Sequence, residues 1–225
     1  MILSIAAIPD SEEMQQLQAK IDQLSWDDGC KTAGKTAQAV KRNEQAIMKD
    51  AAGQAMRQAI LPRVVENPVL RSAARPRRFS HLVVSRTKDG GHYGPHVDNA
   101  LMGQGETRMR SDLSFTLFLT PPQDYEGGEL VVHAAGSTQT IKAAAGHLVL
   151  YPSSSIHEVR PVTSGIRIVC VGWIESMIAD PVQRELLFDL ENTRASLRQT
   201  LPAQSRELLM LDKTIANLLR MWAWA

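Results

Sequence analysis

The stretch Gly94-Pro95-His96-Val97-Asp98-Asn99 decides how this chain is interpreted, and two later residues complete the pattern. His157 follows Asp98 by 59 residues (157 − 98), and Arg167 follows His157 by ten (167 − 157). Side chains at positions i and i+2 of an extended strand point to the same side, so His96 and Asp98 can bind one ion together. Two imidazoles and one carboxylate that leave other coordination positions open are typical of non-haem Fe(II) sites. We therefore predict that His96, Asp98 and His157 are metal ligands with a catalytic role.

The sequence around these residues supports this interpretation. The segment from Gly146 to Pro152 has the composition of a buried strand bounded by turn residues, and His157 follows its end. Arg167 opens the most apolar strand of the chain, Ile166 to Ile174. A planar guanidinium suits a carboxylate that arrives with a co-substrate. A lone histidine or arginine is more often structural or exposed, so the prediction depends on the combination.

The order of apolar segments predicts a mixed α and β fold. Short β-rich segments separated by glycine and proline turns are spaced as in a β-sandwich or jelly roll. The strands are expected at 79–85, 113–119, 129–133, 138–142, 147–150 and 166–174. Pro161 requires a bulge or bend between His157 and Arg167.

Helices are expected at both ends of the chain. Asp10 and Asp180 are expected N-caps, a further helix is expected from about Asn43 to Ile60, and the last helix ends near Trp222. We predict a double-stranded β-helix (jelly-roll) core at 78–176, an N-terminal helical support at 1–77 and a C-terminal helical segment at 177–225 that packs on the core. A barrel of this kind brings distant strands face to face, so His157 can meet the first two ligands.

Composition and charge restrict the class of protein. Lys and Arg number 25 against 24 Asp and Glu, so the net charge of +1 gives no reason to expect a nucleic-acid or membrane surface. Cys30 and Cys170 offer no disulfide framework, which suits a reducing cytosol. The first eight residues are too short for a signal peptide, so we expect a cytoplasmic protein. Trp222 and Trp224 leave a homo-oligomer open, because aromatic residues are favoured in interfaces.

Several further segments carry a family resemblance. They are Trp26-Asp27-Asp28-Gly29, Ala33-Gly34, Val40-Lys41-Arg42-Asn43, Gly90 to Asn99 with Tyr93 three before His96, Glu126-Gly127-Gly128-Glu129-Leu130, Pro152…His157…Arg167, Gly172 to Met177 and Arg184 to Leu190. With these segments the chain resembles the prolyl-hydroxylase branch of the Fe(II)/2-oxoglutarate dioxygenases, and within that branch the bacterial PKHD-type hydroxylases. The resemblance covers nearly the whole chain and weakens after about residue 200.

The resemblance implies a reaction and its cofactors. The predicted ligands would hold Fe(II), Arg167 would hold the distal carboxylate of 2-oxoglutarate, and Tyr93 would lie near the co-substrate. The reaction would use O2 to hydroxylate a small molecule or a protein side chain, with conversion of 2-oxoglutarate to succinate and CO2. The family also suggests L-ascorbate, which has no residue signature here. One departure concerns Arg86-Thr87, where relatives commonly have Arg-Tyr; Tyr93, Ser114 or Thr116 could supply the hydroxyl instead.

Two other classes of protein stay open on the ligand residues alone. A cupin-like hydrolase or isomerase could bind Zn or Mn with the same three residues, although it would have no use for Arg167. A non-catalytic sensor could bind iron or 2-oxoglutarate without turnover. The substrate is expected to be chosen by the loop from Leu101 to Met109, and Asn99 is expected either to orient Asp98 or to cap a turn.

Overall fold

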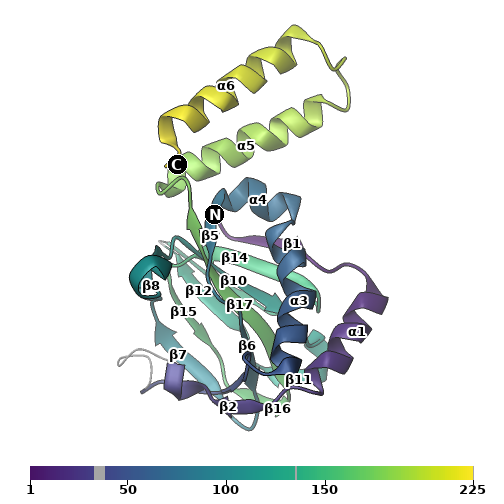
Figure 1. Ribbon diagram of the computed structural model, residues 1–225, viewed down its shortest axis with the longest axis vertical. Coiled ribbons are helices and arrows are strands. Elements are labelled where there is room, and N and C mark those ends of the chain that lie inside the picture. The colour runs from purple at the N-terminus through teal and green to yellow at the C-terminus, as the bar shows by residue number, and fades with distance from the viewer. Residues whose placement is uncertain (33–38, 135, 225) are drawn as a thin grey trace.

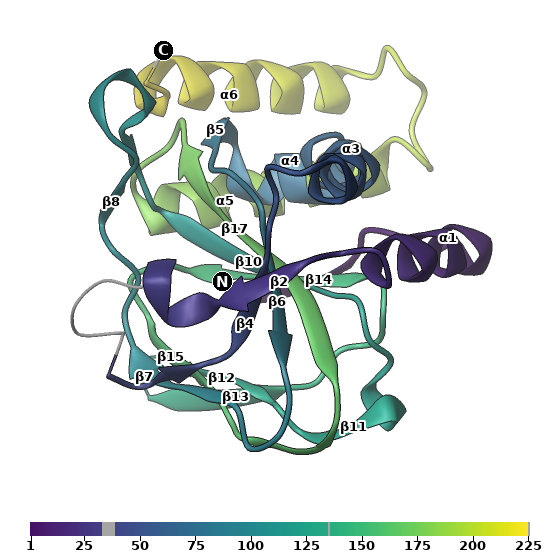
Figure 2. The same ribbon diagram turned by 60° about the horizontal axis from the view of Figure 1, so that its bottom comes forward.

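The computed structural model describes residues 1–32, 39–134 and 136–224. Across these residues two antiparallel sheets face each other, and helices lie against the outside of one sheet and beyond its end (Figure 1, Figure 2). This mixed arrangement of α and β is the predicted one. The Ala33-Gly34 pair that contributed to the resemblance lies outside the described residues.

The larger sheet holds eight strands in the described part of the chain. In order they are β1 (Leu3–Ala6), β14 (His147–Pro152), β10 (Leu113–Phe118), β17 (Arg167–Ser176), β6 (Val83–Thr87), β4 (Glu44–Ala46) and β2 (Trp26–Asp28), with β5 (Pro76–Phe79) paired to β17. The smaller sheet runs β13 (Ser137–Ile141), β12 (Leu130–Ala134), β15 (Ile156–Val159), β7 (His92–His96) and β3 (Lys41–Arg42). Two short ladders pair β11 (Tyr125–Gly127) with β16 (Val162–Gly165) and β8 (Leu101–Met102) with β9 (Met109–Arg110).

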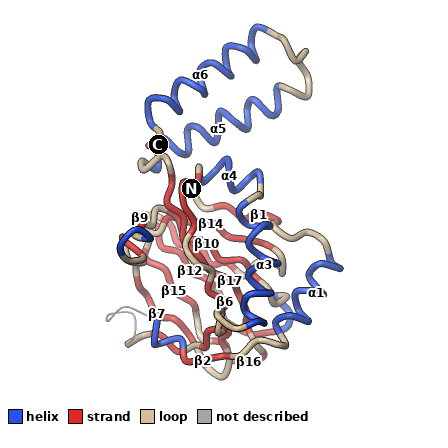
Figure 3. The backbone as a smooth tube through the Cα atoms, in the orientation of Figure 1, coloured by secondary structure: helices blue, strands red, loops and turns tan. Residues whose placement is uncertain are grey.

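The helices lie at the margin of the strands (Figure 3). Three of them, α1 (Ser11–Ile21), α3 (Ala51–Val65) and α4 (Pro68–Ala74), pack on the outer face of the larger sheet. Two further helices of the described residues, α5 (Pro181–Leu197) and α6 (Arg206–Trp222), form a hairpin beyond the sheets with its own small core around Leu187 and Ile215. Short 3-10 turns occupy Gly29–Thr32, Gly105–Thr107 and Pro122–Asp124. The predicted N-caps are confirmed, since the side chains of Asp10 and Asp180 each accept two backbone N–H groups of the following turn.

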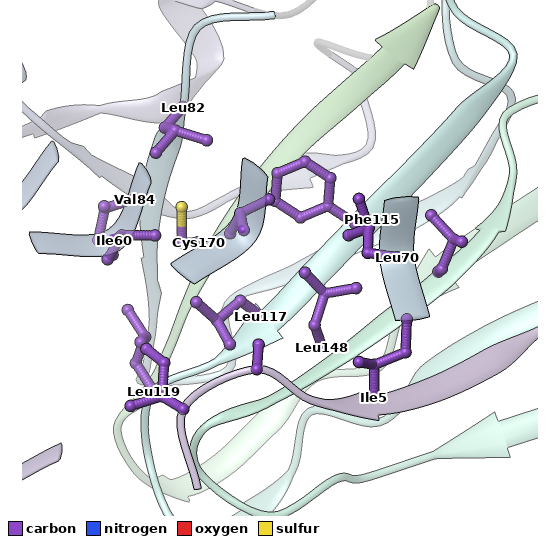
Figure 4. Packing of buried hydrophobic residues seen from close by; sticks show 14 of the residues in the cluster. Ile5, Ile60, Leu70, Leu82, Val84, Phe115, Leu117, Leu119, Leu148 and Cys170 are labelled. Carbon is purple, nitrogen blue, oxygen red and sulfur yellow. The ribbon is translucent and has the colours of Figure 1, made fainter. Parts of the chain in front are cut away.

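Strand β10 shows how the two sides of the larger sheet differ. All six of its residues are buried. Phe115 and Leu117 point toward Ile60 and Leu70 of the covering helices and form the main core with them (Figure 4). The alternate residues Ser114 and Thr116 line a cavity between the two sheets. The period of two along the strand therefore separates a core face from a functional face.

Two expectations about the N-terminal region were wrong. Residues 44–46 form a strand, and the helix expected from about Asn43 begins at Ala51 after the N-cap Asp50. That helix also continues through Pro62 to Val65. An interior proline costs about 3 kcal/mol, and the complete burial of neighbouring apolar side chains such as Ile60 and Val64 offsets this cost.

The last helix, α6, ends at Trp222 as expected. Cys30 and Cys170 are free thiols, and burial raises the pKa of Cys170 to about 12. The apolar stripe of α6 packs against α5, with Leu211, Leu218 and Leu219 around the small core. Over the described residues no helix combines the length and the apolar character needed to span a membrane.

Candidate metal centre

The three predicted ligands meet in space. Ligand atoms of His96, Asp98 and His157 all lie within 4.8 Å of one another. The two histidines are Cα partners on the neighbouring strands β7 and β15, and their ring centroids are 4.3 Å apart. Asp98 Oδ2 lies 3.6 Å from His157 Nε2. Two candidate ligands thus come from adjacent strands of the smaller sheet, and the third follows β7.

The expectation that His96 and Asp98 share a strand was wrong, because β7 ends at His96. Asp98 is therefore held by side-chain contacts rather than by a backbone ladder. His157, expected just past a strand, instead lies within β15, and the ladder between β15 and β7 shifts register between His157 and Val159. The predicted break near Pro161 is confirmed, since β15 ends at Val159 and β16 begins at Val162.

Hydrogen bonds settle which ring nitrogen of each histidine faces the site. His96 Nδ1 lies 2.8 Å from the Gly94 carbonyl oxygen, and His157 Nδ1 lies 3.0 Å from that of Ser155. A carbonyl oxygen accepts hydrogen bonds and cannot donate them, so each Nδ1 carries a proton, which leaves Nε2 as the ring nitrogen available to a metal. Burial, together with the charge of His157, lowers the pKa of His96 to about 4. The imidazole of His96 is therefore neutral at physiological pH, which is the form that binds a metal.

Two aromatic rings hold the imidazoles in place. The Tyr93 ring stacks on His96 with centroids 3.6 Å apart and planes 15° from parallel. The Tyr151 ring meets His157 edge-on at 5.1 Å. Burial, followed by the charge of Asp98, raises the pKa of Tyr93 to about 12. Tyr93, expected near the co-substrate, thus lies against an imidazole of the site.

A cavity of about 420 Å³ opens beside the three candidate ligands, between the two sheets. Its polar lining includes Arg167, Thr87, Ser114 and Thr116 from the larger sheet. Leu101, Met102 and Gly103 also line it, so the loop expected to choose the substrate does face the cavity. Thr87, which replaces a common family tyrosine, is buried and is the Cα partner of Arg167.

Arg167 is the first residue of β17 and is 2% exposed. Its guanidinium carbon lies 5.3 Å from the centroid of the Phe118 ring. Its Nε and Nη2 atoms have no hydrogen-bond partner among the described residues. Burial lowers the pKa of Arg167. A buried guanidinium with unused donors is costly unless an anion pairs with it, so the site is suited to a carboxylate.

The structure adds one residue that the sequence reasoning missed. The hydroxyl of Tyr125 is buried and also has no hydrogen-bond partner in the described part of the chain. Gly128, at φ +68°, lies against both the Arg167 and the Tyr125 side chain. A Cβ added at this position would lie 2.8 Å from Arg167 Cδ and 3.1 Å from Tyr125 Cε2, so the absence of a side chain at Gly128 leaves room for both. In the sequence Tyr125 precedes Glu126-Gly127-Gly128 and has no signal of its own, because an aromatic residue is ordinary in a strand.

Comparison with known proteins agrees with the geometry. Residues 82–175, which include all three candidate ligands and Arg167, match the model of the 2OG-Fe(II) oxygenase superfamily. Residues 182–223, most of the α5–α6 hairpin, match the PKHD-type hydroxylase C-terminal domain. The viral collagen prolyl hydroxylase of Paramecium bursaria Chlorella virus-1 is similar in structure, with TM-score 0.54 at 18% identity, covering 78% of this chain and 96% of the other. The fold and the site thus define a 2-oxoglutarate- and Fe(II)-dependent oxygenase.

Full-length relatives identify the family within that class. A PKHD-type hydroxylase of Hyphomonas neptunium is 45% identical over 222 residues, covering 99% of both chains. One of Synechococcus elongatus is 44% identical over 223 residues, covering 99% of this chain and all of the other. The chain belongs to the PKHD-type hydroxylase family. It is an oxidoreductase, and the cofactors of its family are Fe(II) and 2-oxoglutarate.

Proposed function

We propose that this protein hydroxylates a C–H bond of its substrate with O2 and converts 2-oxoglutarate to succinate and CO2. The observation that carries the proposal is one cavity holding both the three convergent ligands and a buried arginine with unused donors. The ligands suit Fe(II), which bound with 2-oxoglutarate supplies the oxidising power for C–H hydroxylation. A metal hydrolase would gain nothing from the arginine, so this pairing favours an oxygenase.

The protein's own residues bind and orient. His96 and His157 would bind iron through Nε2, and Asp98 would supply the single negative charge of the ligand set. Arg167 and Tyr125 would receive the distal carboxylate of 2-oxoglutarate, because three polar atoms that lack partners within the described part of the chain (Arg167 Nε and Nη2, and the Tyr125 hydroxyl) are buried there. Apolar neighbours such as Leu130 and Val169 line the cavity and limit the entry of water, which strengthens these polar contacts.

We infer that the substrate approaches past the loop from Leu101 to Met109. Val97 and Leu101 line the cavity and are nonetheless 55% and 52% exposed, so they form an apolar rim. Arg78 Nη1 donates to the carbonyl oxygens of Glu106 and Arg108, at 3.4 and 3.2 Å, and thereby ties the loop to β5. This rim would contact apolar parts of either a small molecule or a protein side chain.

Replacement of Tyr125 by phenylalanine is expected to weaken 2-oxoglutarate binding roughly tenfold. A hydrogen bond to a charged group contributes about 1.5–3 kcal/mol, and 1.4 kcal/mol corresponds to a factor of ten. The ring is kept, so its packing against Lys142 and Gly128 should persist. Calorimetric titration of the metal-loaded protein would measure the effect, with 2-oxobutyrate, which lacks the distal carboxylate, as the control ligand. If the substitution weakened the binding of both ligands equally, Tyr125 would not contact the distal carboxylate.

An anaerobic titration of the metal-free protein tests the proposed function. Fe(II) is added first and 2-oxoglutarate second, and the visible difference spectrum is recorded. A charge-transfer band that needs both additions, followed by succinate formation in air, is the expected result. Tight metal binding without the band would favour a cupin-like metalloenzyme, and a band without succinate would favour the sensor.

A further inference from the structure

Two buried serines connect the Asp98 carboxylate to the larger sheet. Ser114 Oγ lies 2.6 Å from Asp98 Oδ2 and 2.7 Å from Ser153 Oγ. Ser114 and Ser153 are each 2% exposed. Ser114 belongs to β10, in the middle of the larger sheet, and Ser153 lies in the turn between β14 and β15. The carboxylate after β7 is thus linked to strands of the opposite sheet.

The Asp98 carboxylate at the end of this chain determines which hydroxyl donates each hydrogen bond. An ionised carboxylate can accept hydrogen bonds but cannot donate them, so Ser114 donates its proton to Asp98. The Ser114 hydroxyl then has lone pairs for its other partner, and Ser153 donates to Ser114. When all hydrogen bonds of a chain point in the same direction, each bond polarises the next hydroxyl group and strengthens its hydrogen bond. A hydrogen bond to a charged acceptor is also stronger than one between neutral groups.

Asp98 needs such an anchor more than the two histidines do. Each histidine lies in a strand, and its Nδ1 donates to a backbone carbonyl oxygen. Asp98 lies two residues beyond the end of β7, outside any ladder. Ser114, in contrast, is fixed in register between Tyr151 of β14 and Trp173 of β17. Ser114, which lies within the sheet ladders, therefore determines the position of the Asp98 carboxylate, which lies outside them.

The backbone next to Asp98 has an anchor of its own. The carbonyl oxygen of Asn99 accepts a hydrogen bond from Ser111 Oγ at 2.5 Å, so the backbone after Asp98 is tied down at this point. The turn after β14 supports two ligands at once, since Ser153 reaches Asp98 through Ser114 and the Ser155 carbonyl oxygen accepts from His157 Nδ1. Partners of this kind commonly orient metal ligands and affect metal affinity.

We propose that Ser114, supported by Ser153, is a positioning residue that holds the Asp98 carboxylate toward the two imidazoles. This inference rests on the proposed function of the three residues as an iron site. Fixing the carboxylate before the metal arrives removes the entropy cost of ordering it at binding. The opposing explanation is that the serines satisfy each other as buried polar groups and stabilise the fold alone.

Titration of the metal-free full-length protein with Co(II), used as an air-stable stand-in for Fe(II), separates these explanations. Three variants are compared: Ser114→Ala, Ser153→Ala and, as a matched control, Ser176→Ala. Ser176 is a fully buried serine on β17 whose hydroxyl bonds to the backbone of Arg75 and Ile178. The free energy of unfolding without metal is measured for each variant, so that affinity and fold stability are known independently.

The expected loss of Co(II) affinity is roughly 10–100-fold for Ser114→Ala, the range seen when an outer partner of a ligand is removed. Ser153→Ala should lose less, and Ser176→Ala should stay close to wild type even where its fold stability falls. The proposal is overturned if Ser114→Ala binds Co(II) as tightly as wild type. Should Ser114→Ala fail to fold, Ser153→Ala decides, and unchanged affinity there overturns the proposal. If the wild-type protein itself binds no Co(II), the proposed metal site fails rather than the serine assignment.

Discussion

Replacement of Asp98 by alanine is expected to abolish iron-dependent succinate formation while the fold persists. The substitution removes the carboxylate of the ligand set, so the loss should exceed the 10–100-fold effect of removing an outer partner. The fold should persist because Asp98 lies outside the sheet ladders and outside the hydrophobic core. His157→Ala is expected to have the same effect, since it removes a second ligand.

The measurement combines succinate formation, metal titration and unfolding of each variant. Asp98→Asn is the matched control for shape, because its amide oxygen can still accept the Ser114 hydrogen bond. It should keep the fold and lose most of the metal affinity, which would show that the charge matters and not the volume. Full iron-dependent activity in Asp98→Ala or His157→Ala would show that the three residues are not the iron ligands.

Replacement of Arg167 by alanine is expected to weaken 2-oxoglutarate binding by roughly 100-fold or more with metal still bound. Nε and Nη2 are buried donors that lack a partner among the residues that the structure describes, and two charge-assisted hydrogen bonds to a carboxylate contribute about 3 kcal/mol or more. Iron affinity should change little, because Arg167 lies on β17 of the opposite sheet from the histidines. The same calorimetric titration of metal-loaded protein gives both quantities.

Arg160→Ala is the matched control for charge, because Arg160 is exposed and lies just seven residues earlier. Arg167→Lys tests geometry, since an ammonium cannot reproduce the planar fork of a guanidinium; intermediate binding is expected. A Kd for 2-oxoglutarate in Arg167→Ala within a few-fold of wild type would contradict the assignment. Together the Asp98 and Arg167 variants separate loss of the metal from loss of the co-substrate.

The sequence alone was sufficient for the three ligands and Arg167 as candidates, for the jelly-roll core and for the helix caps. The reason is that these depend on local chemistry and spacing: a carboxylate and two imidazoles, an apolar strand, and Asp before a first helical turn. The N-terminal strands were harder, because a two- or three-residue strand such as Glu44–Ala46 shows no period of its own.

Tyr125 and Ser153 became candidates only through the tertiary structure, and Ser114, expected from the sequence as a possible co-substrate hydroxyl, proved there to contact Asp98 instead. Ser114 and Ser153 are 39 residues apart in sequence and 2.7 Å apart in space. A serine in a buried strand or a tyrosine before a glycine pair carries no pattern that distinguishes function from packing. Whether such a hydroxyl contacts a ligand depends on which strands become neighbours and in which register, and long-range pairing decides that. The sequence therefore determined the chemistry that this protein can perform, and the packing of its two sheets decided which side chains hold that chemistry in place.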